Sequence, residues 1–335
     1  MKKAKKINEL DYVYASTRVK TAEGRGTLRD RLTSFAEASN GEALVTAVLE
    51  SGLISDVAVK TPADAADAAL VGAADLLRSS VPDPDLYGFL FYKYDCNNIK
   101  VALKESILGV EDTSRYFTCG TVEPSAVREA VFSRNYSALP ENMGKRAKEA
   151  QDAYETTKEA RTIDLSLDRG CFEDIEESVA SSGVPFFKEY ASALVDSTNY
   201  LSFLRISSSG MAPGACSSLM SRAALPGGTV DVSVFEEASA ADTHEERIAA
   251  LVLKTDSVDY REALSRDGDP DAVAAALEKA VDKVVEKADA KAFGPEVPAV
   301  FFIRREAEVR AVRIAASMIA SGKTAEAIKA RIGIK

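Results

Sequence analysis

A ten-residue pattern recurs along this chain at intervals of roughly one hundred residues, and no other feature constrains the fold as strongly. It begins at Asp95 as DCNNIKVALK, returns at Asp196 as DSTNYLSFLR, and has a weaker third copy, REAEVRAVRI, at Arg305. A second block, GTVEPS at Gly120 and GTVDVS at Gly228, follows the first two copies in the same order. Two blocks repeated in one order predict three copies of one structural unit. Such a chain is more typical of a symmetric scaffold than of an enzyme with a single active site.

Composition favours an all-α fold. Apolar residues make up 46% of the 335 residues and charged residues 28%, with many Ala, Leu, Glu, Lys and Arg and few alternating β-branched runs. No apolar run approaches the ~20 residues that a membrane span requires. The lysines near the N-terminus are not followed by the apolar stretch of a signal peptide, so we expect a cytoplasmic protein.

The side chains that usually carry chemistry are sparse. The four cysteines are far apart in sequence and form no paired metal or redox motif, so we expect reduced packing residues. The only histidine, His244, lies in an acidic, polar stretch and is expected at the solvated surface. We therefore predict no catalytic residue, no metal ligand and no cofactor.

Charge is unevenly distributed. The net charge of −10 argues against a nucleic-acid partner. Residues 1–31 carry nine Lys and Arg against four Asp and Glu, residues 300–335 carry eight against three, and residues 236–290 carry fifteen acidic against seven basic. Two interpretations stay open: solvated helix faces, or two basic termini that form one patch for an acidic protein partner.

Apolar spacing predicts the helices. A first helix is expected over 8–36, with Leu10, Val13, Tyr14 and Thr17 as its apolar face, and another over 63–78. Ser233 and Glu236 have the spacing of a capping box, and Asp269-Pro270 is expected to open a further helix.

Three longer helices carry the repeated pattern, each preceded by a Pro-containing turn. These turns are Asp83-Pro84, Gly183-Val-Pro185 and Gly294-Pro295, and Gly109 is expected to end the first helix. The expected apolar stripes are Phe89, Tyr92, Cys96, Ile99, Leu103 and Ile107; Tyr190, Ala193, Ser197, Tyr200 and Leu204; and Phe302, Val309, Val312, Ala316 and Ile319.

Each of these helices carries two polar residues three positions apart, on one flank of its stripe. They either hydrogen-bond a turn of the same domain, which we favour, or face a neighbouring copy or a partner. We expect a structural role for Asp95 and Asn98, for Asp196 and Asn199, and for Glu308, which follows Arg305 in the third copy.

Four segments together resemble a known family. They are DYVYASTRV at 11–19 with Glu23, the residues YD and NIK within 94–100, LPGGTVD at 225–231, and RREAEVRAVR at 304–313. In this order they resemble the C subunits of the bacterial and archaeal A/V-type rotary ATPases (ATP synthases), kin of the d subunit of eukaryotic V-type ATPases. The similarity covers nearly the whole chain.

This resemblance implies an all-helical funnel of three similar domains about a pseudo-threefold axis, here 1–124, 125–232 and 233–335. It implies a protein without a catalytic site that links the central stalk to the membrane rotor ring and transmits torque for ion-coupled ATP synthesis or hydrolysis. The protein would lie at the cytoplasmic face of the membrane as a peripheral part of the complex. Candidate contact residues are Arg18, Arg25, Arg304, Arg305, Arg310 and Arg313.

Two other functions fit less well. The segment SGKT at 321–324 has Ser317, not glycine, at the first position of a phosphate-binding loop, and no strand precedes it. Gly322 more simply ends one helix and Thr324 starts the next. A generic helical-repeat adaptor for another protein partner is the better alternative, although helix-pair arrays repeat every ~34 to 47 residues.

Overall fold

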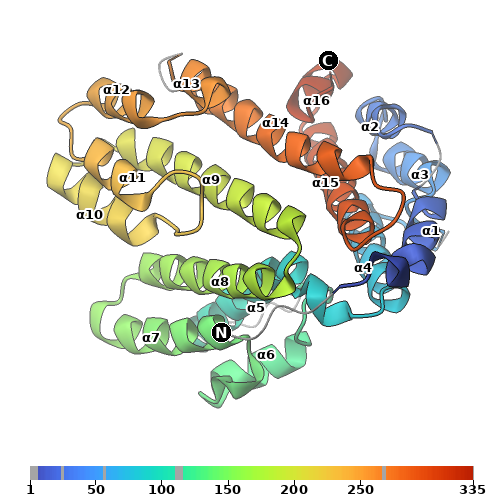
Figure 1. Ribbon diagram of the computed structural model, residues 1–335, viewed down its shortest axis with the longest axis horizontal. Coiled ribbons are helices and arrows are strands. Elements are labelled where there is room, and N and C mark those ends of the chain that lie inside the picture. Colours follow the sequence, from blue (N-terminus) through green and yellow to red (C-terminus); the bar gives the residue numbers. More distant parts are fainter. Residues whose placement is uncertain (1–6, 24–25, 56–57, 110–115, 266–268, 335) are drawn as a thin grey trace. The chain divides into compact units, whose positions relative to one another are not determined.

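The computed structural model describes residues 7–23, 26–55, 58–109, 116–265 and 269–334, and Figure 1 shows their arrangement. Within these ranges the regular structure is entirely helical, with sixteen α-helices, short 3₁₀ turns and no strand. The predicted all-α class is therefore confirmed. None of the described helices combines the length and the apolar character needed to cross a bilayer.

The chain divides into two compact units. Unit 1 contains Gly88–Lys287, and unit 2 combines Ile7–Tyr87 with Ala288–Lys335. The helices of unit 1 are α5 (Gly88–Leu108), α6 (Pro124–Phe132), α7 (Glu141–Thr157), α8 (Ala160–Ser182), α9 (Pro185–Ser207), α10 (Pro213–Ala223), α11 (Val232–Ser239), α12 (His244–Lys254), α13 (Val258–Leu264) and α14 (Pro270–Asp289). Those of unit 2 are α1 (Val13–Thr21), α2 (Leu28–Ala36), α3 (Gly41–Ser51), α4 (Pro62–Ser80), α15 (Glu296–Ala320) and α16 (Ala325–Arg331).

Helix boundaries follow the proline and glycine signals of the sequence. A 3₁₀ turn that begins at Pro84 leads into helix α5. Helix α5 ends before Gly109, whose φ is +67°. Gly183, with φ +70°, separates α8 from α9, and α9 begins at Pro185. Both glycines adopt the left-handed conformation that a side chain disfavours.

The segment SGKT is a helix boundary as well. Gly322 follows the end of α15 with φ +68°, and the Thr324 side chain accepts a hydrogen bond from the Ala327 N–H at the start of α16. Both expected roles are confirmed. The geometry of a helix junction accounts for these residues without a bound phosphate.

The prediction of one helix over 8–36 is wrong. A 3₁₀ turn (Glu9–Tyr12) leads into α1, which ends at Thr21, and α2 starts anew after the Thr27 cap. The Thr27 side chain accepts from the Asp30 N–H at 3.2 Å, and the Asp30 carboxylate accepts from the Thr27 N–H at 2.9 Å. This reciprocal capping box starts a new helix and interrupts the expected one.

The predicted apolar face of the first helix is also wrong. Leu10 and Tyr14 are 65% and 63% exposed, and Val13 is exposed too. Helix α1 packs against α4 and α15 through its opposite side, where Ala15 and Val19 are fully buried. The smaller side chains on that side allow the neighbouring helices to approach closely. That side is therefore buried, although Leu10 and Tyr14 on the other side are larger.

The cap of α11 differs from the expectation by two residues. Asp231 accepts hydrogen bonds from the Ser233 N–H at 2.9 Å and from the Ser233 hydroxyl at 2.5 Å, so Asp231 is the N-cap and Ser233 lies inside the helix. The Asp carboxylate reaches the free amides first, and Ser233 therefore does not head a capping box.

An aromatic cluster forms the centre of the C-terminal part of unit 1. The rings of Phe235 and Tyr260 lie 5.1 Å and 5.0 Å from the ring of Tyr200. Phe203 and Leu251 complete this buried group. Helices α9, α11, α12 and α13 are thus held around one core.

Candidate partner-binding surface

The repeated polar residues are buried, and they tie two long helices of unit 1 to their following turns. On α5, the Asp95 carboxylate accepts from the Thr121 hydroxyl at 2.6 Å, from the Thr121 N–H at 3.0 Å and from the Val122 N–H at 3.1 Å. Asn98 exchanges two hydrogen bonds of 2.8 Å with the backbone of Phe117. We refer to such a contact as an anchor.

The same anchor occurs on α9. Asp196 accepts from the Thr229 N–H at 2.8 Å and from the Thr229 hydroxyl at 2.6 Å. The Asn199 amide donates to the Leu225 carbonyl at 2.9 Å and accepts from the Leu225 N–H at 2.8 Å. The two anchors therefore use the same donors and acceptors at corresponding positions.

The anchors explain the second repeated sequence block. A Cβ atom on Gly120 would lie 2.3 Å from an Asp95 oxygen, and one on Gly228 would lie 2.4 Å from an Asp196 oxygen. The threonine that follows each glycine donates twice to the same carboxylate. Gly-Thr recurs because the carboxylate needs both the space and the two donors.

The electrostatics of the α9 anchor reflect burial. Removal from water raises the pKa of the Asp196 carboxyl above its ordinary value, and the hydrogen bonds from Thr229 oppose that rise. The carboxyl is an acceptor inside the unit with no exposed reactive atom. The contact is structural, and it leaves neither aspartate available to a partner.

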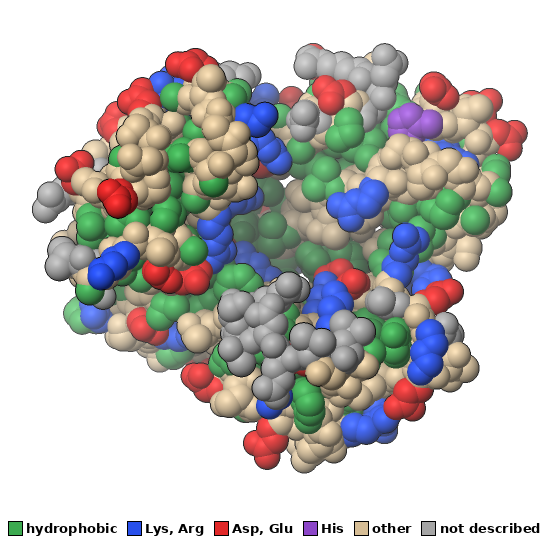
Figure 2. All heavy atoms as spheres, turned by 180° about the vertical axis from the view of Figure 1, so that it is seen from behind, with side chains coloured by type: hydrophobic (Ala, Val, Ile, Leu, Met, Phe, Trp, Pro, Cys, Tyr) green, Lys and Arg blue, Asp and Glu red, His purple; other side chains and the backbone are tan. Residues whose placement is uncertain are grey.

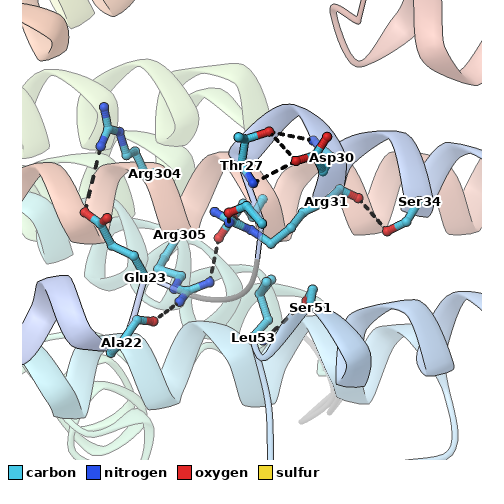
Figure 3. Close-up of polar contacts among 12 residues, drawn as sticks. Ala22, Glu23, Thr27, Asp30, Arg31, Ser34, Ser51, Leu53, Arg304 and Arg305 are labelled. Carbon is cyan, nitrogen blue, oxygen red and sulfur yellow. Dashed lines mark hydrogen bonds and ion pairs between the residues drawn. The ribbon is translucent and has the colours of Figure 1, made fainter.

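In unit 2 the corresponding positions of α15 carry charge (Figure 3). Glu308 is 1% exposed and accepts from Arg31 Nε at 2.5 Å and from Arg305 at 2.8 Å. Arg305 also donates to the Ala22 carbonyl and covers the ring of Phe301 at 5.3 Å. One carboxylate thus joins α15 to the segment around α2, which lies 277 residues earlier in sequence.

The six candidate arginines occupy different environments. Arg305 is 4% exposed and satisfied inside unit 2, so it does not belong to a surface of this unit. Arg304 pairs with Asp289 and lies 3.9 Å from Glu23, and Arg313 pairs with Asp67 at 2.6 Å. Arg18 donates to the carbonyl and hydroxyl of Ser79. Arg25 lies outside the described residues.

Helical geometry separates these cations further. Successive residues of an α-helix are rotated by about 100°, so Arg304 and Arg313 project to opposite sides of α15 while Arg310 and Arg313 share one side. Arg310 is exposed and makes no ion pair with any residue that the structure describes. Of the candidate cations on α15, Arg310 and Arg313 therefore share one side of the helix, and Arg310 is the more exposed of the two.

Sequence reasoning missed two exposed apolar surfaces. One is the face of Leu10, Val13 and Tyr14 in unit 2. The other lies in unit 1, where Leu253 is 86% exposed beside a groove of about 760 Å³ lined by residues such as Ile248 and Leu264. Unpartnered apolar surface of this kind commonly marks a protein interface. The spacing of residues 10–14 did indicate an apolar face, but we interpreted that face as part of the buried core.

Charged side chains of both signs lie at the surface. On the face drawn in Figure 2, basic and acidic side chains are interspersed with exposed hydrophobic ones, and the single histidine is visible. Among the described residues, no three His, Cys, Asp or Glu side chains come together to hold a metal ion.

One further buried carboxylate has no sequence signature. Asp174 on α8 accepts from the backbone amides of Asn142 and Met143, each at 2.9 Å, and so caps the first turn of α7. Burial raises its pKa despite these hydrogen bonds. The capping group lies 32 residues after the amide it serves, beyond any local capping pattern.

Comparison with known proteins shows the family of the chain. The family model described as ATP synthase (C/AC39) subunit matches residues 29–331. No curated protein matches the chain. The matched range includes both anchors of unit 1, the Arg31–Glu308–Arg305 group and the exposed residues of α12 and α15.

Proposed function

Because the chain belongs to the ATP synthase (C/AC39) subunit family, which holds the C subunits of A/V-type ATPases and the d subunits of V-type ATPases, we propose that it links the central stalk of such an ATPase to the membrane rotor ring. The family match over residues 29–331 is the observation that carries this proposal. In this role the protein carries out no reaction. It transmits torque during ion-coupled ATP synthesis or hydrolysis, at the cytoplasmic face of the membrane.

The buried anchors support a role in transmitting torque. Each joins a long helix to the turn that follows it by hydrogen bonds inside a closely packed helical unit. Packed interiors have low compressibility and transmit strain, as a rigid adaptor requires. The interfaces to stalk and ring would each need more than about 1,000 Å² with an apolar centre and a charged rim.

We further propose that the protein has three copies of one helical unit, arranged as a funnel. Matching anchors on α5 and α9 support two copies inside unit 1. Because Glu308 is bound by Arg31, the third copy would be completed by the N-terminal segment and not by residues 233–335 alone. This division differs from the expected domains 1–124, 125–232 and 233–335, because it places the N-terminal and C-terminal segments in one unit.

A binding experiment tests the proposal. The purified full chain is offered to central-stalk proteins and to detergent-solubilised rotor ring of the same organism's ATPase, at low and at moderate salt. We expect stable binding that weakens with salt, because charged rims mainly raise the encounter rate. Failure to bind both components would contradict the rotor role and favour a helical adaptor for another partner.

Charge reversal then locates the contact. Arg310→Glu with Arg313→Glu is expected to weaken binding at least tenfold if the exposed cations of α15 face a partner. Arg161→Glu with Arg261→Glu is the matched control, since it makes the same change of charge on exposed residues of unit 1. Equal loss in both double variants would show only a dependence on net charge.

A further inference from the structure

Two of the four cysteines, remote in sequence, meet inside unit 1. Cys96 lies on α5 and Cys171 on α8, and each is 4% exposed. The Cys96 thiol donates to the Leu167 carbonyl at 3.5 Å, and Leu167 is one helical turn before Cys171. The neighbouring Cys96 thiol and burial raise the pKa of Cys171. Helices α5 and α8 pack directly against each other, so this contact bridges two elements.

The pair lies beneath a surface ion pair. Lys100 Nζ donates to Asp168 Oδ1 at 2.5 Å, and that oxygen lies 3.9 Å from the Cys96 sulfur. The Lys100 side chain is 20% exposed and that of Asp168 is 46% exposed. This partly exposed pair is the route by which a molecule as small as a peroxide would reach Cys96.

We propose that Cys96 and Cys171 are a reversible redox modification site, at which a peroxide-class oxidant forms a disulfide that fastens α5 to α8. Because the Cys96 sulfur already contacts the α8 backbone one turn before Cys171, the bond requires only that the two sulfurs approach each other. The cross-link restrains sliding of one helix along the other and shortens the free chain between residues 96 and 171 in the unfolded state.

The reaction balances with one peroxide for each pair. The Cys96 thiol gives up its proton, and its sulfur attacks a peroxide oxygen. The O–O bond breaks to leave Cys96 sulfenic acid, and the departing hydroxide takes up that proton as the first water. The Cys171 sulfur then attacks the Cys96 sulfur, the S–S bond forms, and the hydroxyl leaves as a second water with the Cys171 proton. The two thiols lose two electrons and peroxide gains them. A dithiol reductant reverses the reaction.

The order of the two sulfurs follows from their environments. The contact with Cys96 and burial raise the pKa of Cys171, so its thiol stays protonated until it attacks the sulfenic acid on Cys96. Cys96 is adjacent to the exposed pair and is reached first. Cys216 offers a contrast, since it donates only to the carbonyls of Ile206 and Met211 at 3.7 Å and 3.5 Å.

The test uses the full chain, reduced and freed of reductant, then treated with hydrogen peroxide or diamide. We expect reactive thiols in the denatured product to fall from four to two, a mass loss of two hydrogens, and proteolytic peptides joined through Cys96 and Cys171. Dithiothreitol should restore all four thiols. Four thiols after treatment, or peptides joined through other cysteines, would overturn the proposal.

Variants sharpen the result. Cys216→Ala should still form the linked peptides, whereas Cys96→Ala and Cys171→Ala should each abolish them. Since an alanine variant could unfold, wild-type protein oxidised in urea serves as a second check. It should give mixed pairings, because only the folded chain holds residues 96 and 171 together. The same single pairing in urea would show that the fold does not select it.

Discussion

The α9 anchor and the Glu308 group solve the same problem with different chemistry. Asp196 holds a turn only 33 residues ahead through a hydroxyl and a backbone amide. Glu308 holds a segment 277 residues away through two guanidinium groups. The short connection supplies backbone donors at low entropic cost, whereas the long one requires side chains with strong, directional charge.

This difference has an energetic consequence. Loss of one neutral donor leaves the Asp196 carboxyl with its other partners, while loss of Glu308 removes the carboxylate that two buried guanidinium groups share. Buried ion pairs add little net stability, but breaking one is costly because the remaining charge is uncompensated. We therefore expect substitution of Glu308 to lower the free energy of unfolding of unit 2 more than loss of one donor to Asp196 lowers that of unit 1.

The largest effect is expected from Glu308→Ala. It removes the carboxylate that the buried guanidinium groups of Arg31 and Arg305 share, which should lower the free energy of unfolding of unit 2 by about 3–5 kcal/mol. Urea denaturation monitored by circular dichroism measures the change. Glu50→Ala, on an exposed position of α3, is the control and should change stability by less than about 0.5 kcal/mol. Equal effects of the two substitutions would contradict the role of Glu308.

The next effect is expected from Gly228→Ala. The new methyl group would lie 2.4 Å from the Asp196 oxygen, so the turn must move and the anchor weakens, at a cost of about 1–3 kcal/mol. Gly120→Ala should cost a similar amount, because its geometry is the same.

Gly214→Ala is the matched control in unit 1. It lies in α10 with no heavy atom within 4 Å of the added methyl group, and alanine should stabilise the helix by about 0.5–1 kcal/mol. Denaturation of all three variants gives the comparison. A stabilising effect at Gly228 would mean that the anchor does not depend on close approach.

A smaller effect is expected from pH: the contributions of Asp196 and Asp259 to the free energy of unfolding should depend on pH in opposite directions. The folded pKa of Asp196 is raised by burial, so its contribution to stability is full below the unfolded pKa and is lost as pH rises through the folded value. The advantage of wild type over Asp196→Asn should therefore shrink between about pH 4 and pH 7.

Asp259 provides the reverse case. The hydrogen bond from Lys283 lowers its pKa, so its contribution is present above the unfolded pKa and is lost as pH falls. The advantage of wild type over Asp259→Asn should therefore stay nearly constant above about pH 4 and shrink as the pH falls below that value. Unfolding curves at several pH values measure both trends. The same trend for both variants would rule out this difference between buried and exposed carboxylates.

The smallest effect on stability is expected at the exposed face of Leu10 and Tyr14. Replacing both with serine should change the free energy of unfolding by less than about 0.5 kcal/mol, yet weaken binding to the stalk or the ring if this face is an interface. Val19→Ala, on the buried side of α1, should cost about 1–3 kcal/mol without that specific loss of binding. Unchanged binding of the serine variant would remove this face from the proposed interface.

Local chemistry in the sequence was sufficient for much of the fold. Pro185, Gly109, Gly322 and Thr324 act where they were expected, because their backbone preferences and capping oxygens operate within a few residues. The spacing of Asp196 and Asn199 correctly predicted one shared flank of a helix. Their partners, Thr229 and Leu225, lie in and just before the second repeated block, and the sequence offers no means of placing them beside the helix in space.

The failures have a common origin in packing. Leu10 and Tyr14 have the spacing of a core face, yet α4 and α15 cover the side of Ala15 and Val19 instead. Arginine is a residue type that usually lies at the surface, yet Glu308 and the Ala22 carbonyl hold Arg305 inside unit 2.

The sequence by itself therefore determined the helical class, most helix ends and the family, because these depend on local backbone preferences and on short motifs in order. The tertiary structure alone decided which apolar face is buried, which arginines remain exposed, and that Cys96 meets Cys171. Each of these outcomes depends on which neighbour removes a side chain from water or supplies its counter-charge, and contacts between distant segments have no local signature in the chain.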